Sequence, residues 1–321
     1  MPVLDIQNLT TYYFTLRGPV KAVEGISFQV EKGEAVGLAG ESGCGKTTAA
    51  LSVLRLLPRG GRIIGGKIMF KGEDVVNLTE DTMRKKIRWK GISVVFQGAM
   101  NALNPVYKVG DQIVEAILAH GPNIDKHEAK EITVKLMAMV GIDPSRVDNY
   151  PHEFSGGMRQ RALIAMSVAC NPDLLIADEP GTALDVIVQA QVLRMMKELK
   201  ERLNLGMILI THDLSIISEI CEKCAIMYAG KIVERGDIVA IFKEPLHPYT
   251  QGLMKAFPSI KAAKTEMTSI PGFPPDLLNP PSGCRFHPRC SYAMDVCKKE
   301  DPKPIEISAG HYVACHLIEK K

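Results

Sequence analysis

The sequence has no long apolar run and no strong charge bias. No stretch of about 18 consecutive apolar residues occurs, so no membrane-spanning helix is expected. The N-terminus lacks the basic region followed by an apolar stretch that marks an export signal. Lys and Arg number 39 against 36 Asp and Glu, and no basic run is interleaved with aromatic residues as in a nucleic-acid-binding tract. These absences predict a soluble, unexported protein that does not bind nucleic acid.

Internal repeats are also absent, and only one phosphate-loop pattern occurs in the 321 residues. This length suits one main domain with an appendage, and a hydrophobic fraction of 46% is enough for a substantial core. Short apolar or alternating runs predict strands at residues 4–7, 26–30, 35–39, 174–177 and 207–210. Apolar spacings of three and four predict helices at residues 47–57, 113–140 and 189–203. Strands that alternate with helices indicate an α/β core with parallel crossovers.

Residues 40–47 fit the phosphate-loop pattern G-x-x-x-x-G-K-[ST]. Backbone N–H groups of such a loop wrap a polyphosphate, Lys46 adds a positive charge, and Thr47 offers its hydroxyl to Mg²⁺. The residues expected to bind nucleotide here are Gly40, Glu41, Ser42, Gly43, Cys44, Gly45, Lys46, Thr47 and Thr48.

A second glycine-containing segment, Ser155-Gly156-Gly157, stands just ahead of a helix rich in Ala, Ile and Met. It predicts another helix N-terminus that binds phosphate. With the phosphate loop, it resembles the ATP-binding cassette (ABC) family over roughly residues 3–255. In that family the Ser-Gly-Gly signature of one subunit closes over the ATP held by another, so the resemblance implies a dimeric ATPase.

Asp178 and Glu179 end the apolar run of residues 174–177, where a Mg²⁺–ATP hydrolase needs carboxylates. The alternative is that both carboxylates cap the next helix. The resemblance implies that Asp178 binds the Mg²⁺ shell, that Glu179 polarises the attacking water and that His212 contacts the γ-phosphate. It also implies that Gln97 senses Mg²⁺ and the γ-phosphate, as the glutamine that links the core to a helical insert.

The resemblance further implies a D-loop at Asp185, which communicates between the two ATP sites. Tyr13 is expected to stack on adenine, with Tyr12 and Phe14 as neighbouring alternatives that could instead fill the small N-terminal sheet. The chain departs from the family pattern at Cys44, Gly98-Ala99, Met158 and Gly181. Of these, Gly98-Ala99 and Gly181 lie in regions of communication and put coupling rather than hydrolysis in doubt, whereas Cys44 should leave the backbone cradle of the phosphate loop intact.

Four cysteines, Cys284, Cys290, Cys297 and Cys315, lie in the last 38 residues. A segment this short rarely builds a strong core alone, so a metal is expected to hold it together. Four thiolates suit Zn²⁺ or an iron–sulfur cluster, and the absence of paired C-x₂₋₄-C knuckles favours a [4Fe–4S] cluster over zinc. Free thiols are the third alternative. Cys221 and Cys224 are interpreted as small buried residues near a helix start.

The cysteine-containing C-terminal residues 284–321 resemble the dipeptide and oligopeptide branch of the family, and so does the sequence Leu246-His247-Pro248-Tyr249-Thr250. The resemblance implies a P-loop NTPase fold of ABC type, with a RecA-like core, a small antiparallel β subdomain and a helical insert. The expected domains are an ATPase domain at 1–257 with the insert at about 99–160, a Pro-rich linker at 258–283 and a Cys-rich metal-binding domain at 284–321.

The expected function is ATP hydrolysis that energises import of dipeptides or oligopeptides, at the cytoplasmic face of the membrane. The partners implied are a second homologous ATPase, two transmembrane permease subunits that dock near residues 97–104, and indirectly an extracytoplasmic substrate-binding protein. Nickel or oligosaccharides remain alternative cargoes. A non-transport ABC ATPase is disfavoured, because the chain has neither two cassettes nor a long coiled-coil or zinc insertion.

Overall fold

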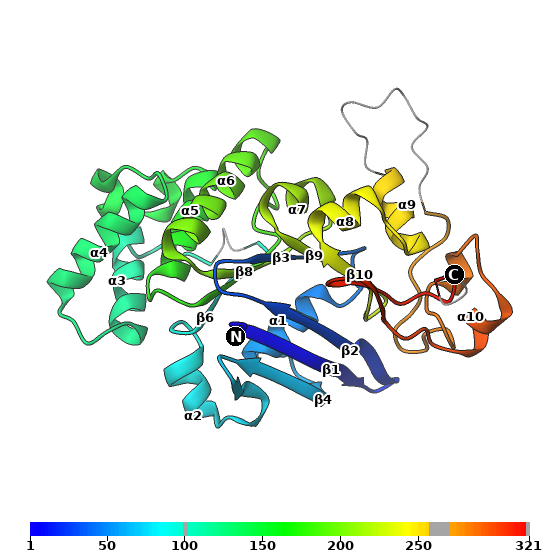
Figure 1. Ribbon diagram of the computed structural model, residues 1–321. Coiled ribbons are helices and arrows are strands. Elements are labelled where there is room, and N and C mark those ends of the chain that lie inside the picture. The colour runs from blue at the N-terminus through cyan, green and yellow to red at the C-terminus, as the bar shows by residue number, and fades with distance from the viewer. Residues whose placement is uncertain (99–101, 257–269, 319–321) are drawn as a thin grey trace. The chain divides into compact units, whose positions relative to one another are not determined.

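A computed structural model describes residues 1–98, 102–256 and 270–318, and its chain divides into two compact units (Figure 1). The first unit comprises Met1–Leu4, Val30–Ala35 and Asn77–Leu209. The second comprises Asp5–Gln29, Val36–Val76 and Ile210–Lys321. Each unit is therefore assembled from segments that are distant in the sequence.

The first unit contains three neighbouring strands in the order β8, β7, β6. Their bounds are Gly206–Ile210 for β8, Leu174–Asp178 for β7 and Ile92–Val95 for β6. Strands β6 and β7 are parallel, with Ile92 opposite Leu174 and Val95 opposite Ala177. All residues of β7 and β8 are buried, as expected for continuous apolar runs inside an α/β protein.

The first unit also contains helices and helical turns. They are α2 (Glu80–Thr82), a π-helical turn (Met83–Ile87), α3 (Val109–His120), α4 (Lys126–Met139), α5 (Gly156–Val168) and α6 (Val186–Leu203), with 3₁₀ turns at Pro144–Asp148 and Pro151–Glu153. Helices α3, α4 and α5 pack against one another (Figure 1). Helix α6 begins three residues before its predicted start at Gln189, because the Asp185 side chain caps it by accepting from the Val188 N–H.

The second unit contains two sheets. The first has the order β2, β1, β4, β5, with β1 at Leu4–Thr15, β2 at Gly18–Val30, β4 at Gly61–Phe70 and β5 at Glu73–Asp74. Figure 1 shows β1, β2 and β4 side by side. The other has the order β11, β12, β10, β9, β3, with β3 at Ala35–Ala39, β9 at Lys223–Tyr228, β10 at Lys231–Asp237, β11 at Ile305–Ser308 and β12 at His311–Val313. Strand β3 is parallel to β9, whereas the β9–β10, β10–β12 and β12–β11 pairs are antiparallel. The predicted α/β class is confirmed, and the strand directions in this sheet are mixed.

The helices of the second unit are short. They are α1 (Lys46–Leu54), α7 (Leu214–Ile220), α8 (Ile238–Lys243), α9 (Pro248–Ala256) and α10 (Asp295–Lys299), with 3₁₀ turns at Val75–Asn77 and His287–Arg289. Helix α7 ends at Ile220, so Cys221 follows a helix and Cys224 lies on β9, and the predicted helix start there is wrong. Both cysteines are buried, as interpreted from the sequence.

The C-terminal segment, residues 270–318, is packed into the core of the second unit. Phe286 lies among Tyr228, Tyr249 and His247, with ring centroids 5.1, 5.3 and 5.7 Å away. Strand β12 pairs with β10, which places Val313 opposite Glu234. The segment thus shares a core with residues far upstream. In the described part of the chain, no helix is both long and apolar enough to cross a membrane.

Candidate functional site

The phosphate loop joins β3 to α1, and its glycines are required by close backbone contacts. A Cβ on Gly40, which has φ 147°, would lie 2.1 Å from the Met227 carbonyl oxygen. A Cβ on Gly45, which has φ 106°, would lie 2.2 Å from the Ala22 carbonyl oxygen. Gly43, by contrast, would meet nothing within 4 Å. The loop is thus pressed against its own unit on one side and has open space beside Gly43, where a phosphate can approach the backbone.

Lys46, the first residue of α1, places its ammonium inside this loop. Its Nζ donates to the carbonyl oxygens of Gly40 at 2.7 Å and Glu41 at 3.0 Å. Cys44, where the family more often has Ser, is buried beside the same ammonium, with its Sγ 3.6 Å from Nζ. Burial raises the pKa of the Cys44 thiol, so it stays neutral and adds no negative charge to the loop.

The three neighbouring aromatic rings of β1 have different surroundings. The Tyr13 hydroxyl lies 3.4 Å from the hydroxyl of Thr48, which follows the phosphate loop. Phe14 is half exposed beneath Arg62, whose Cζ is 5.6 Å from the ring centroid. Tyr12 faces Glu24, and burial together with that carboxylate raises its pKa. Tyr13 therefore contacts α1, the helix that follows the phosphate loop.

His212 lies in the short connection between β8 and α7. The preceding Thr211 donates its N–H to the carbonyl oxygen of Leu38 at 3.3 Å, which fixes the connection beside the end of β3. Asp213 caps α7 by accepting from the Ser215 N–H at 2.8 Å. His212 is exposed.

In the first unit, Gln97 and Glu179 meet because they follow the adjacent parallel strands β6 and β7. The Gln97 Nε2 donates to Glu179 Oε2 at 2.8 Å, and Thr182 Oγ1 donates to the same oxygen at 3.1 Å. Asp178 is buried at the end of β7. Glu179 has φ 47°, a left-handed conformation that is uncommon for a residue other than glycine and concentrates at functional sites.

The Ser-Gly-Gly segment and the residues before α6 are also neighbours in the first unit. Ser155 caps α5 by accepting from the Met158 N–H at 3.3 Å. A Cβ on Gly157 would lie 2.4 Å from Val188 Cγ1, so the start of α5 packs closely on the first turn of α6. Close packing also favours glycine at position 181, where the chain departs from the family pattern, because a Cβ there would lie 2.5 Å from Gln189 Cγ. The departure at Gly98-Ala99 extends into residues 99–101, outside the described residues.

The C-terminal cysteines do not form the predicted metal site. Within residues 1–98, 102–256 and 270–318, no group of three or more His, Cys, Asp or Glu side chains is arranged to hold a metal ion. All four cysteines are free, and burial, with a smaller effect of the neighbouring thiols, raises the pKa of Cys284 to about 12. The same causes raise the pKa of Cys315 to about 11. Burial thus keeps the thiols of Cys284 and Cys315 neutral in this structure.

The prediction of a [4Fe–4S] cluster, with zinc as its alternative, is thus wrong, because the described residues contain no group arranged to hold a metal ion. The expectation failed because it treated the segment as a fold of its own. Side chains such as Phe286 instead insert into the core of the second unit, which supplies the apolar burial that a metal was expected to replace.

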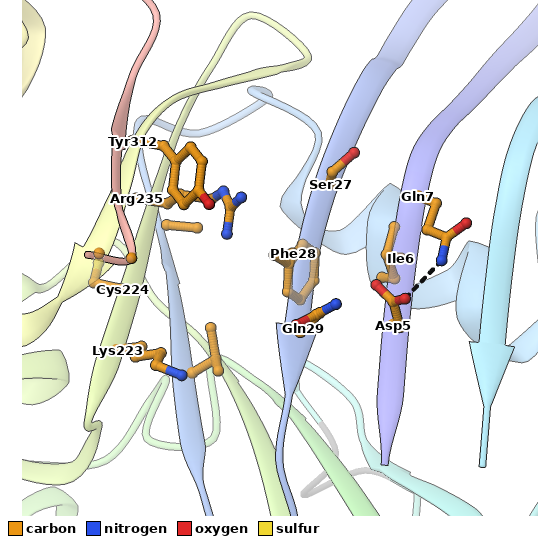
Figure 2. Close-up of a pocket in the computed structure, with 14 residues that line it drawn as sticks. Asp5, Ile6, Gln7, Ser27, Phe28, Gln29, Lys223, Cys224, Arg235 and Tyr312 are labelled. Atoms are coloured by element: carbon orange, nitrogen blue, oxygen red, sulfur yellow. Dashed lines mark hydrogen bonds between the residues drawn. The ribbon is translucent and has the colours of Figure 1, made fainter. Parts of the chain in front are cut away.

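A cavity of about 400 Å³ lies elsewhere in the second unit, between residues of β1 and β2 and residues of β9, β10 and β12 (Figure 2). Arg235 lies over the ring of Tyr312 there, 3.9 Å from its centroid. None of its lining residues belongs to the phosphate loop.

Sequence reasoning missed the residues that surround Glu41. Its carboxylate accepts two hydrogen bonds from Arg289, and its backbone N–H donates to the Tyr249 hydroxyl. No local pattern could have paired Glu41 with a residue 248 positions away.

Comparisons with known proteins agree with this geometry. A family model described as ABC transporter matches residues 23–182, and one described as Oligopeptide/dipeptide transporter, C-terminal region, matches residues 233–297. An ATP-binding cassette solved as a dimer bound to ADP and Pi has a TM-score of 0.65 and 23% identity, covering 73% of this chain and 98% of that one. At this identity the likeness shows the fold.

Sequence relatives match over almost their whole lengths. The dipeptide transport ATP-binding protein DppD of Bacillus subtilis is 45% identical, with 99% of this chain and 96% of that protein covered. The protein of the same name from Escherichia coli is 43% identical, with 98% and 97% covered. The oligopeptide transport ATP-binding protein OppD of Bacillus subtilis is 44% identical, with 98% and 89% covered. The chain therefore belongs to the ABC transporter family, as an ATP-hydrolysing protein of the branch that carries the oligopeptide/dipeptide transporter C-terminal region.

Proposed function

We propose that this chain is the subunit that hydrolyses ATP to energise import of dipeptides or oligopeptides through a membrane ABC transporter. The observation that carries the proposal is the match to peptide-transport ATP-binding proteins at 42–45% identity, which extends through the C-terminal region. That region lies beyond the part common to ABC ATPases, so it narrows the proposal to peptide transport.

The phosphate loop, residues 40–48, holds the nucleotide phosphates in this proposal. Its backbone N–H groups and the Lys46 ammonium face the phosphates, and Tyr13 stacks on the adenine. The donor set fits Mg²⁺, since the hydroxyl of Thr47, the carboxylate of Asp178 and the amide oxygen of Gln97 are hard oxygen ligands. Mg²⁺ supplies charge neutralisation at the β- and γ-phosphates.

Glu179 is the proposed general base, and His212 is the proposed contact to the γ-phosphate. Hydrogen bonds from Gln97 and Thr182 orient the carboxylate of Glu179 at the end of β7, and a carboxylate held in this way can accept a proton from water. The left-handed backbone at Glu179 supports this role, because strained residues concentrate at active sites.

A second, homologous ATPase is the proposed partner. The signature at Ser155, Gly156 and Gly157 would bind the ATP held by that partner, and Asp185 would face it. The residues after Asp185 support an interface, because Val186 is 80% exposed and Ile187 is 72% exposed. Adjacent exposed apolar side chains are typical of surfaces that another protein covers.

Two permease subunits would dock on the first unit near residues 97–104, at the cytoplasmic face of the membrane. Phe96, Val106 and Tyr107, which flank this segment in the sequence, are exposed apolar residues. The central residues 99–101 lie outside the described residues. The extracytoplasmic substrate-binding protein would act through the permeases.

The test is peptide uptake and ATP hydrolysis by the transporter assembled with its permeases and second ATPase in proteoliposomes. Glu179→Gln should lower ATP turnover about 100-fold or more, as expected for loss of a general base, and should abolish uptake of a labelled dipeptide. Glu201→Gln, on the exposed surface of α6, is the matched control and should leave both rates unchanged. Hydrolysis by Glu179→Gln near the wild-type rate would contradict the assignment, and uptake of nickel or an oligosaccharide instead of peptide would contradict the cargo.

A further inference from the structure

A buried arginine of the C-terminal segment holds the phosphate loop. Arg289 donates from Nη1 to Glu41 Oε2 at 2.6 Å and from Nη2 to Glu41 Oε1 at 2.9 Å. The Arg289 side chain is 5% exposed and that of Glu41 is 27% exposed. Two parallel hydrogen bonds between a guanidinium and a carboxylate fix orientation as well as distance. The second residue of the loop is therefore held in one geometry.

Glu41 is held at its backbone as well. Its N–H donates to the hydroxyl of Tyr249 at 2.9 Å, and Tyr249 is fully buried on α9. Its carbonyl oxygen accepts from Lys46 Nζ at 3.0 Å. Glu41 therefore links Arg289 and Tyr249 to the phosphate-loop lysine through direct hydrogen bonds.

Arg289 is fixed from the other side by its own segment. Its Nε donates to the carbonyl oxygen of Pro271 at 2.8 Å, and its Cζ lies 5.7 Å from the ring centroid of Tyr228. The preceding Phe286 packs on Tyr228 and Tyr249, which anchors the turn that carries Arg289. Hydrogen bonding to Glu41 raises the pKa of Arg289, so the guanidinium stays charged. The cation is thus rigidly placed before any ligand binds.

We propose that Arg289 is a positioning residue for the ATPase reaction. Through Glu41 it holds the phosphate loop, and with it Lys46, in the conformation that binds the phosphates of ATP. The inference rests on the proposed assignment of residues 40–48 to nucleotide binding. Because Arg289 acts on the loop and not on the reacting atoms, it sets nucleotide affinity and leaves the chemical step unchanged.

The experiment is calorimetric titration of the purified chain with Mg²⁺ and a non-hydrolysable ATP analogue. Arg289→Ala should raise Kd about tenfold, a typical effect of losing hydrogen bonds between charged groups. Glu41→Gln should raise it similarly, and adding Arg289→Ala to Glu41→Gln should change it little further, because both variants break one interaction. In the assembled transporter, Arg289→Ala should raise KM and leave kcat unchanged.

The matched control is Asp301→Asn. It breaks the ion pair between Asp301 and Lys231, which also ties the C-terminal segment to β10 but does not touch the phosphate loop. Its Kd should equal that of the wild type. Arg289→Lys keeps the positive charge but cannot form the two parallel hydrogen bonds, and it should raise Kd a few-fold. This variant replaces Arg289→Ala in the experiment if Arg289→Ala does not fold.

Three results would overturn the inference: wild-type Kd in folded Arg289→Ala or Arg289→Lys, fully additive effects of Arg289→Ala and Glu41→Gln, or an equal rise in Kd with Asp301→Asn. Failure of the proposed nucleotide-binding site would give a different result from failure of the proposed role of Arg289. Either the wild-type chain would not bind the ATP analogue, or Lys46→Ala would bind it with the wild-type Kd.

Discussion

Phe286 anchors the C-terminal segment by packing, and Phe286→Ala is predicted to lower the free energy of unfolding by about 3 to 5 kcal/mol. The side chain is 3% exposed and contacts the rings of Tyr228, Tyr249 and His247. Truncation would leave a cavity among aromatic rings from β9 and α9, which are fixed by their own elements and cannot collapse onto it. Each lost aromatic pair adds about 0.5 to 1.5 kcal/mol to the cost of lost burial, so the upper part of the range is expected.

The measurement is urea unfolding of the purified chain, followed by circular dichroism. Tyr292→Ala is the matched control, since Tyr292 is an aromatic residue of the same segment that is 55% exposed, and it should change stability by less than about 0.5 kcal/mol. The reasoning is refuted if Phe286→Ala costs no more than the control. It is also refuted if a metal chelator lowers the stability of the wild-type chain by a similar amount, because a bound metal would then hold the segment.

Three further predictions concern the site and its support. Burial lowers the pKa of His247 to about 3, so this ring stays neutral when folded and binds a proton on unfolding below its ordinary pKa of about 6.5. The contribution of the neutral ring to the free energy of unfolding is therefore complete above that pH and falls by about 1.4 kcal/mol by pH 5.5. His247→Asn should flatten the dependence of the free energy of unfolding on pH between 7 and 5.5. Equal slopes in the two proteins would contradict this. Ser155→Arg should leave ATP binding by the isolated chain unchanged but abolish hydrolysis in the assembled transporter, and weakened binding would argue against a role across a dimer. Gly40→Ala should weaken ATP binding at least about tenfold because its Cβ would meet the Met227 carbonyl, whereas Gly25→Ala, at positive φ in open space, should leave ATP binding unchanged and serves as the control.

Local signals in the sequence were sufficient for the core elements. The apolar runs that became β3, β7 and β8 were found within one residue of their bounds, because strands buried on both faces need continuous apolar residues. Strand β1 extends to Thr15, well beyond the predicted residues 4–7. The prediction was too short because polar residues interrupt the alternation of apolar and polar side chains along this strand. For the site, the apolar run of residues 174–177 correctly placed Asp178 and Glu179 at the end of a strand, but the hydrogen bond between Gln97 and Glu179 was not predicted.

Non-local contacts were beyond such reasoning. The pairing of β12 with β10 and the paired hydrogen bonds between Arg289 and Glu41 depend on how distant segments meet in space. The metal site was wrong for the same reason. The number and spacing of Cys284 and its companions along the chain say nothing of how their sulfur atoms are arranged, and the apolar partners of Phe286 lie some 40 to 60 residues upstream, beyond the reach of local pattern reasoning.

The pairing of β12 with β10 also protects the protein from self-association. Without residues 305–313, β10 would present an open row of backbone N–H and C=O groups, which is a template for strand addition by another copy. In the full chain the sheet instead ends in β11, a strand of only four residues, three of them exposed, with a charged Glu306 and with Pro302 and Pro304 just before it. Short, charged, proline-flanked edges resist further pairing. Proteolytic loss of residues 305–313 would therefore make β10 the edge strand of the sheet, and this edge would be prone to aggregation.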